Sequence, residues 1–300
     1  MKTRNAEILL AAVIIARSTS FMMSKAGLDA IEPMNMMAIR FTIAFIIMAV
    51  IFGRRLTHIN TRTFISGLLV GVAYLAVMVA EMMGLNYTDS SRIAFLENAA
   101  IVYVPLMEAS LTRHLPAPRG LLCSFMAITG VGFLSLSGGL TGFGIGEALG
   151  VLSGILYGIA IIVTDRFTEG TDGLLVGIIE IGTMALGAWI ISFAIETPVL
   201  PDDPVCWALI LALATVCTCF GWTLQPLAQK YVSTERTSMF LAFSPLSAAL
   251  LGVIFLHESL GAGGIAGGAL IMIGILLQTV FTIREGKNGH TENNRQSQKE

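Results

Sequence analysis

Long apolar stretches alternate with short polar segments along almost the whole chain. A membrane-spanning helix needs about 20 consecutive apolar residues, and ten stretches of roughly this length can be marked out. They lie at 6–26, 34–53, 63–84, 92–112, 119–137, 147–166, 173–195, 205–227, 236–256 and 263–283. Glycine, proline and charged residues separate them, as is typical of short loops. The pattern predicts an all-α polytopic membrane protein with ten transmembrane helices.

The positive charges indicate how these helices are oriented, because cytoplasmic loops of membrane proteins are rich in lysine and arginine. With the N-terminus in the cytoplasm, most of the 18 Lys and Arg residues fall on the cytoplasmic side. The opposite side receives the acidic loops around Asp29, Glu196 and Asp202, with Lys25 and Arg92 near its edge. We therefore expect a multi-pass protein of the inner or plasma membrane with both termini in the cytoplasm. Residues 284–300 are polar without apolar periodicity, which predicts a disordered cytoplasmic tail.

The composition indicates which classes of partner the protein is expected to contact. The chain is 55% hydrophobic and 13% charged, whereas a soluble domain carries about 25% charged residues. The lipid bilayer is thus an expected partner, and the lack of a basic block argues against nucleic acid. The four cysteines all lie in apolar segments, as small buried residues rather than a disulfide framework. No cofactor and no metal site are expected.

An internal repeat emerges when the two halves are compared at an offset of about 144 residues. The sequence from Tyr87 to Arg92 then matches the sequence from Tyr231 to Arg236, and Gly130 falls opposite Gly274. Each half contains five predicted helices, so the second copy must enter the membrane from the opposite face. We expect two inverted five-helix repeats, at 1–138 and 145–283, an arrangement typical of secondary transporters.

Three segments carry a resemblance to a known family. Arg17-Ser18-Thr19-Ser20-Phe21 with Lys25 is similar to an aromatic-Gly-Ser-Asn-Phe … Lys pattern, although Arg17 and Ser18 stand where Trp and Gly are common. Ala38-Ile39-Arg40-Phe41 is similar to a Leu-Arg-Phe pattern, and the segment from Ser244 to Glu258 to a Pro-to-Glu pattern. Over residues 5–283 the chain thus resembles the drug/metabolite transporter superfamily in its EamA-type, ten-helix form. The resemblance implies an exporter or facilitator of small polar metabolites, with a central cavity between the halves.

Polar groups within the predicted spans are the candidates for solute binding. An ionisable side chain in a spanning helix is costly and by default faces the protein interior or water, and polar stripes at helical spacing converge from several helices. We expect a hydrated substrate-binding cavity lined by Arg17, Ser20, Tyr74, Glu81, Glu97, Asn98, Tyr157, Trp222 and Gln225. No catalytic residue is expected.

Each candidate also has a structural interpretation. Arg17 can neutralise Glu97 or Glu81 as an ion pair, and Arg40 is expected to brace its repeat rather than to touch solute. Glu180 has no partner visible in the sequence, and packing between helices is its expected role. Thr215, Thr218, Trp222, Gln225 and Gln229 recur at helical spacing, either as a pore lining or as contacts between helices.

Small residues predict where helices approach one another closely. Gly150, Gly154 and Gly158 recur every four residues, a pattern of close helix contacts in membranes. The glycines at 263, 264, 267 and 268 offer the tenth helix either a homodimer face or a contact within one subunit, and the second is favoured. Pro105 and Pro245 each remove a backbone hydrogen bond and should kink their helices.

Together these features predict a secondary transporter that moves a small polar metabolite such as an amino acid by alternating access. Export of cationic drugs or toxic compounds by proton antiport is the alternative. An intramembrane enzyme is disfavoured because every Asp and His residue falls at a loop or helix end and no His-Glu-x-x-His motif occurs. A Walker A sequence is also absent, which excludes ATP as the driving force within this chain.

Overall fold

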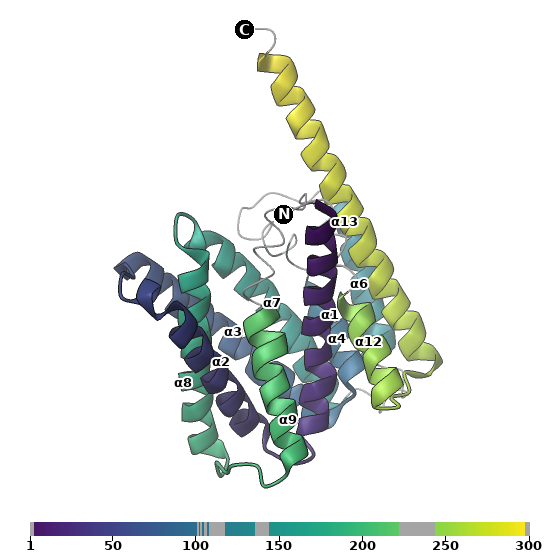
Figure 1. Cartoon of the computed structure of the whole chain (residues 1–300). Helices are drawn as coiled ribbons and strands as arrows, with labels where there is room; N and C mark the ends of the chain where they lie inside the picture. Colours follow the sequence, from purple (N-terminus) through teal and green to yellow (C-terminus); the bar gives the residue numbers. More distant parts are fainter. Residues whose placement is uncertain are drawn as a thin grey trace.

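The computed structural model describes residues 3–100, 102, 104, 107, 118–135, 144–221 and 244–297 (Figure 1). Every regular element among these residues is a helix. In chain order the helices are α1 (Thr3–Gly27), α2 (Pro33–Leu56), α3 (Thr61–Tyr87), α4 (Ser90–Asn98), α6 (Pro118–Ser135), α7 (Ile145–Thr168), α8 (Gly173–Ile195), α9 (Pro204–Ala212), the π-helix η1 (Leu213–Phe220), α12 (Ser244–Phe255) and α13 (Gly261–Ser297).

These helices coincide with the ten predicted spans, as far as each span is described and with α9 and η1 counted together. Six of them are long and apolar enough to cross a membrane, namely α1, α2, α3, α7, α8 and α13. Shorter apolar helices lie at Gly120–Leu134, Pro204–Phe220 and Ser244–Phe255. Large apolar side chains point outward on α8, where Leu186, Ile190 and Phe193 are 64%, 62% and 71% exposed. The chain is a multi-pass helical membrane protein.

The buried apolar side chains form two clusters. The larger joins α2, α3, α8 and α9, with Phe41, Leu85 and Ile178 among its fully or almost fully buried members. The smaller joins α4, α6, α12 and α13 around Leu96 and Ile271. Each cluster therefore takes helices from both predicted repeats.

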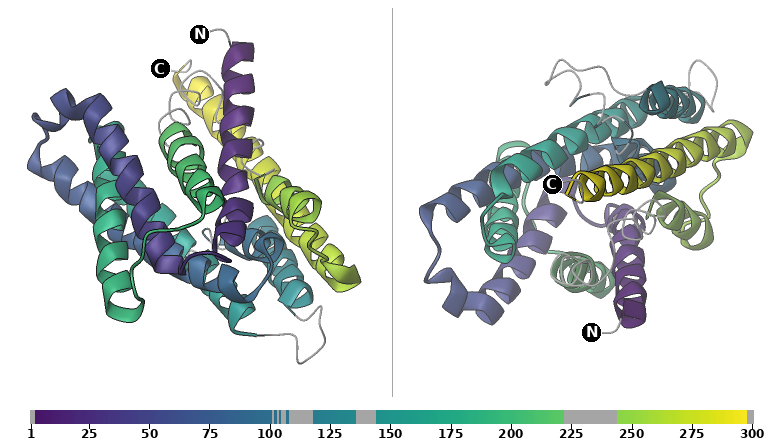
Figure 2. Two further views of the ribbon diagram at one scale, coloured as in Figure 1. Left: turned by 60° about the horizontal axis from the view of Figure 1, so that its bottom comes forward. Right: turned by 90° about the horizontal axis from the view of Figure 1, so that it is seen from above.

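The glycines at the start of α13 pack within the subunit. A Cβ at Gly267 would lie 2.6 Å from the carbonyl oxygen of Gly130 on α6, and one at Gly268 would lie 3.0 Å from the Phe95 ring on α4. The close approach of α13 to α6 is visible in both views of Figure 2. These glycines thus make the in-subunit contact that the sequence favours, while a homodimer through the tenth helix stays a prediction.

The polar residues after 283 differ from expectation. Here α13 continues as a helix to Ser297, and its last turns project beyond the other helices (Figure 1), where the sequence predicts a disordered tail over 284–300. Extending an existing helix costs far less than starting one, so the apolar part of α13 can propagate into a polar sequence that has no proline. The start of α1 lies at the same end of the bundle as this extension.

At the opposite end, which we call the distal end, α1 ends at Gly27 and α3 at Tyr87, while α2, α4 and α7 begin. In the predicted orientation this end faces away from the cytoplasm. Glu196, just beyond α8, closes the start of α2 here. Its carboxylate accepts hydrogen bonds from the backbone amides of Met34 at 2.8 Å and Asn35 at 2.7 Å. Such amides lack partners within their own helix and favour a negative charge.

Candidate functional site

A cavity of about 350 Å³ lies among α1, α2, α3, α4, α7, α8, η1 and α12. Its lining combines seven apolar side chains with polar and charged groups that can orient a small molecule. The lining residues are Ile14, Arg17, Ser20, Phe21, Arg40, Phe41, Tyr74, Val77, Met78, Glu81, Glu97, Asn98, Tyr157, Ile161, Met184, Cys217 and Ser244.

Seven of the nine residues predicted from the sequence lie in this lining. They are Arg17 and Ser20 on α1, Tyr74 and Glu81 on α3, Glu97 and Asn98 on α4, and Tyr157 on α7. The other two, Trp222 and Gln225, lie outside the described residues. The role of all nine residues in substrate binding remains a prediction, but the seven described ones converge on one cavity.

Helix α3 contributes one complete face to the cavity. Tyr74, Val77, Met78 and Glu81 all line it, at the three- and four-residue spacing that puts side chains on the same side of a helix. Glu81 is 1% exposed, so its carboxyl group is withdrawn from the protein surface.

Helix α4 brings Glu97 and Asn98 to the cavity through a close contact with α7. A Cβ at Gly154 would lie 2.5 Å from the carbonyl oxygen of Leu96 and 3.4 Å from the Cα atom of Glu97. Only a glycine allows α7 to approach the α4 backbone this closely. The regular turns of α4 end at Asn98, and the Ala99 backbone amide bonds back to the Phe95 carbonyl at 3.0 Å. The predicted kink at Pro105 lies outside the described residues.

The two acidic groups of the cavity face each other. The side chains of Glu81 and Glu97 lie close enough to interact, and two carboxyl groups can share a hydrogen bond only when one of them holds a proton. Glu97 is 6% exposed, and its Oε2 atom has no hydrogen-bond partner among the described residues. One oxygen of Glu97 therefore keeps unused acceptor capacity.

Arg40 is expected from the sequence to brace its repeat rather than to touch solute, and the structure gives it both a bracing contact and a place in the cavity lining. It does brace the fold, since its Nε atom donates to the Thr218 hydroxyl at 3.1 Å. It also lines the cavity and lies close enough to Glu81 for their charges to interact. The signal that could have found it is its charge inside a spanning helix, since such a side chain by default faces the protein interior or water.

The π-helix η1 changes which side chains of its span face inward. A π-helix closes i→i+5 hydrogen bonds, and the Thr218 hydroxyl bonds to the Leu213 carbonyl at 3.0 Å. Thr218 is buried, whereas Thr215 is exposed and its hydroxyl bonds to the carbonyl of Leu211. The shared face expected for Thr215 and Thr218 is thus wrong, because α-helical spacing does not apply here. Cys217 lines the cavity instead, and its thiol meets the Ala16 carbonyl on α1 at 3.1 Å.

Arg17 and two tyrosines form the other polar side of the cavity. The rings of Tyr74 and Tyr157 meet edge to face, with their centroids 6.0 Å apart. Arg17 interacts with the Tyr157 hydroxyl through its side chain. Its aliphatic stem passes Gly221, where a Cβ would lie 2.8 Å from the Arg17 Cγ atom. The glycine after η1 thus leaves room for the arginine to reach inward.

Glu180 lies apart from this lining. It is 3% exposed on α8, and its Oε1 atom has no hydrogen-bond partner among the described residues. Its backbone carbonyl lies 3.0 Å from the position of a Cβ at Gly71 of α3. This agrees with the expected packing role between helices.

In sum the cavity presents two guanidinium groups, two carboxyl groups, an amide and two phenols. This set can bind a small solute carrying both a positive and a negative charge. No group of three or more His, Cys, Asp or Glu side chains suited to a metal ion occurs among the described residues.

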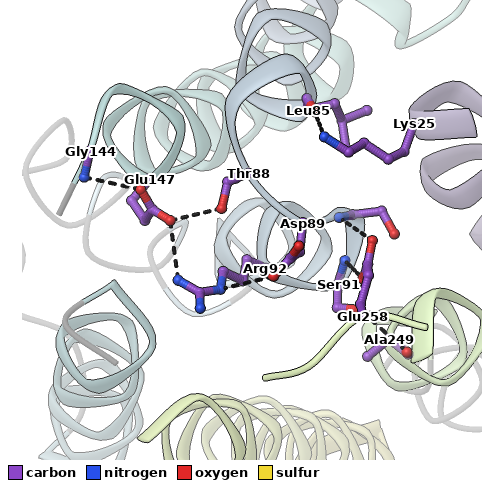
Figure 3. A network of polar contacts seen from close by, with 11 residues as sticks. Lys25, Leu85, Thr88, Asp89, Ser91, Arg92, Gly144, Glu147, Ala249 and Glu258 are labelled. Atoms are coloured by element: carbon purple, nitrogen blue, oxygen red, sulfur yellow. Dashed lines mark hydrogen bonds and ion pairs between the residues drawn. The ribbon is translucent and has the colours of Figure 1, made fainter. Parts of the chain in front are cut away.

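A second polar cluster lies at the distal end, beyond the cavity (Figure 3). Glu147 at the start of α7 accepts hydrogen bonds from the Gly144 amide at 3.1 Å and the Thr88 hydroxyl at 2.7 Å, and it pairs with Arg92 at 3.3 Å. Arg92 also pairs with Asp89 at 3.4 Å. These contacts tie the junction of α3 and α4 to α7.

Glu258 and Lys25 complete this cluster. The Glu258 carboxylate accepts from the backbone amides of Ser90 at 2.7 Å and Ser91 at 2.9 Å, and from the Ser91 hydroxyl, which closes the start of α4. Lys25 near the end of α1 donates to the Leu85 carbonyl near the end of α3 at 2.6 Å (Figure 3). Burial, together with the nearby Glu258, raises the pKa of the Asp89 carboxyl, while Arg92 and Lys25 act in the opposite direction.

Comparison with known proteins adds independent information. A model of the EamA-like transporter family matches the chain twice, over residues 4–136 and 144–280. An uncharacterized transporter of Archaeoglobus fulgidus is 23% identical over 281 residues, which cover 91% of this chain and 96% of that protein. An uncharacterized transporter of Bacillus subtilis is 26% identical over 276 residues, covering 86% of this chain and 87% of its own length.

A solved crystal structure shares the fold, with a TM-score of 0.64 and 15% identity over 92% of this chain and 98% of the other. The family and the relatives above are transporters and not enzymes, as the sequence predicts. With an apolar helical bundle, a charged central cavity and two matches that together span most of its length, the chain belongs to the EamA-like transporter family.

Proposed function

We propose that this protein is a secondary transporter that moves a small zwitterionic metabolite, such as an amino acid, across the inner or plasma membrane by alternating access. The observation that carries the proposal is the make-up of the cavity. Arg17 and Arg40 supply positive charge, and the pair of Glu81 and Glu97 supplies negative charge, within one hollow of about 350 Å³.

The chemistry of an amino acid fits these groups. Its carboxylate can accept paired hydrogen bonds from a guanidinium, the geometry in which arginine binds carboxylates best. Its ammonium group can donate to Glu97, whose Oε2 atom has no partner among the described residues. Burying both charges of a solute is affordable only where each meets an opposite charge.

Alternating access is supported by how the helices are distributed. The cavity is lined by α1 to α4 from the first predicted repeat and by α7, α8, η1 and α12 from the second. The two family matches fall on these same halves. Two inverted five-helix repeats around a central site are a common design of secondary transporters, with both termini on the cytoplasmic side in the predicted orientation.

A second candidate is the export of cationic compounds in exchange for protons. The closeness of Glu81 and Glu97 favours it, because two adjacent carboxyl groups can share one proton and release it when a cation binds. The two arginines in the same cavity oppose it, since a cation must approach them.

Purified protein in liposomes tests the first proposal against the second. We expect uptake of labelled amino acids without a pH gradient, and a loss of about tenfold or more in Arg17→Ala and Glu97→Gln, because each removes a charge-assisted hydrogen bond to the solute. Glu169→Gln serves as the control, since Glu169 is exposed and distant from the cavity lining. Movement of organic cations only, and only against a proton gradient, would support the second candidate. Amino acid uptake that is equal in all variants would refute the assignment of the cavity.

A further inference from the structure

The distal end holds a second hollow, separate from the central cavity. It has a volume of about 460 Å³ and is lined by Lys25, Ala26, Asp29, Asp89, Leu256, His257, Glu258 and Ser259. None of these residues lines the central cavity. We call this hollow the distal vestibule.

Only a short stretch of protein separates the two hollows. On α1, Phe21 lines the central cavity and Lys25, one turn further, lines the vestibule. On α3, Glu81 lines the central cavity and Leu85, one turn further, is fully buried. The hydrogen bond from Lys25 Nζ to the Leu85 carbonyl, 2.6 Å long, joins α1 to α3 at this level.

We propose that Lys25 holds a distal gate closed. Its bond to the Leu85 carbonyl keeps α1 against α3 and closes the central cavity from the vestibule. When this bond is released, the path between the two hollows opens. The proposal rests on the proposed function, because a gate of this kind serves alternating access. It adds a positioning residue outside the cavity lining.

The bond suits this role because it is strong and yet replaceable. The carbonyl at the end of a helix carries partial negative charge and attracts a cation, so the closed position is favourable. Carboxylates of the vestibule are near as substitutes, since the charges of Lys25 and Asp89 interact and Glu258 lines the same hollow (Figure 3). A lysine that turns from the carbonyl to a carboxylate keeps a partner in both positions, which lowers the cost of opening without removing it.

The other ties of the distal end differ from this one. Glu258 and Glu196 hold the backbone amides of α4 and α2, and the helices that they join, α12 with α4 and α8 with α2, are packed against each other. Lys25 instead joins α1 to α3, which share few other contacts. Because little packing supports this hydrogen bond, α1 and α3 can separate more easily than the other helix pairs.

Side-specific labelling tests the gate directly. In full-length protein with its four cysteines replaced by alanine, Ser20→Cys places a thiol in the central cavity. A membrane-impermeant thiol reagent is then applied to intact cells and, separately, to inverted membrane vesicles. We expect Lys25→Met to speed labelling about tenfold or more from the distal side, because a charge-assisted bond closes the gate. Lys25→Arg, which retains the donor, should label as slowly as the parent.

Labelling that is equally slow from the distal side in Lys25→Met would overturn the proposal. Arg55→Met, a change of an exposed residue at the other end of α2, controls for loss of a positive charge. If Lys25→Met fails to reach the membrane, Lys25→Gln is used instead. We expect its labelling rate from the distal side to lie between those of the parent and an open gate. A labelling rate equal to that of the parent would count against the gate. Amino acid transport is measured in parallel on the protein with its native cysteines, Ser20 and Lys25. Faster distal labelling of Lys25→Met, together with no transport by that unchanged protein, keeps the gate and rejects the proposed solute.

Discussion

Carboxyl groups in the central cavity and at the distal end differ in the hydrogen bonds that they accept from the protein. Glu81 and Glu97 lie close to each other in the cavity lining, and one Glu97 oxygen has no hydrogen-bond partner among the described residues. Glu147, Glu196 and Glu258 each accept three hydrogen bonds, at least one of them from a backbone amide. A carboxylate that accepts all its hydrogen bonds from the protein fixes a helix end. A carboxylate with an unused acceptor oxygen can instead bind a solute.

This comparison predicts that distal carboxylates act mainly on stability and cavity carboxylates mainly on transport. Three substitutions probe it, and they are given in order of the expected change in the free energy of unfolding.

Arg40→Met should have the largest effect, because Arg40 both holds the fold together and compensates the charge of a cavity carboxyl group. It removes a buried positive charge that interacts with Glu81 and the donor to the Thr218 hydroxyl, and leaving a buried charge uncompensated costs about 3–5 kcal/mol. Thermal unfolding in detergent measures the loss. The double variant Arg40→Met with Glu81→Leu should regain part of it. Unchanged unfolding of the single variant would show that Arg40 serves solute alone.

Glu258→Ala should follow, with a loss of about 1.5–3 kcal/mol, because bonds to a charged group are worth this much when the partners are left unsatisfied. The same unfolding assay applies. Glu32→Ala is the matched control, since Glu32 lies at the start of α2 at the same end of the molecule but makes no side-chain cap. An equal loss in both variants would contradict the capping role.

Asp89→Asn should have the smallest effect, and one that depends on pH. The pKa of Asp89 is raised in the folded protein above its usual 3.8, so the folded state holds the proton more tightly than the unfolded state. Asp89 therefore adds stability at low pH that is lost as the pH rises through the raised pKa. The variant should lack this decline. Melting temperatures from pH 4 upward test it, and parallel curves for the two proteins would count against the burial of Asp89.

The sequence predicts the positions of the spans well because a membrane imposes a length and a composition on each helix. It also locates the face of α3 that carries Tyr74 and Glu81, since regular helical spacing holds there. The spacing fails in η1, where an i→i+5 pattern separates Thr215 from Thr218. A π-helix is set by packing against neighbouring helices, which no local pattern of residues reveals.

The hydrogen bonds of the distal end could not be predicted from the sequence either. Glu258 and Ser90 are 168 residues apart in the chain, and nothing near either residue indicates the other. The sequence could place Lys25 and Arg92 near the edge of the membrane from charge alone. It could not say that one donates to a helix-end carbonyl and that the other pairs with Glu147.

The two long-range caps also bear on biosynthesis. The amides that begin α2 and α4 are satisfied by Glu196 and Glu258, which follow 162 and 168 residues later. When the first half of the chain leaves the ribosome, these helix starts must rely on water or lipid headgroups until the second half arrives. Contacts this distant in sequence form late in folding. Truncated or stalled chains should thus expose two uncapped helix ends, a defect by which quality control could tell an unfinished protein from a complete one.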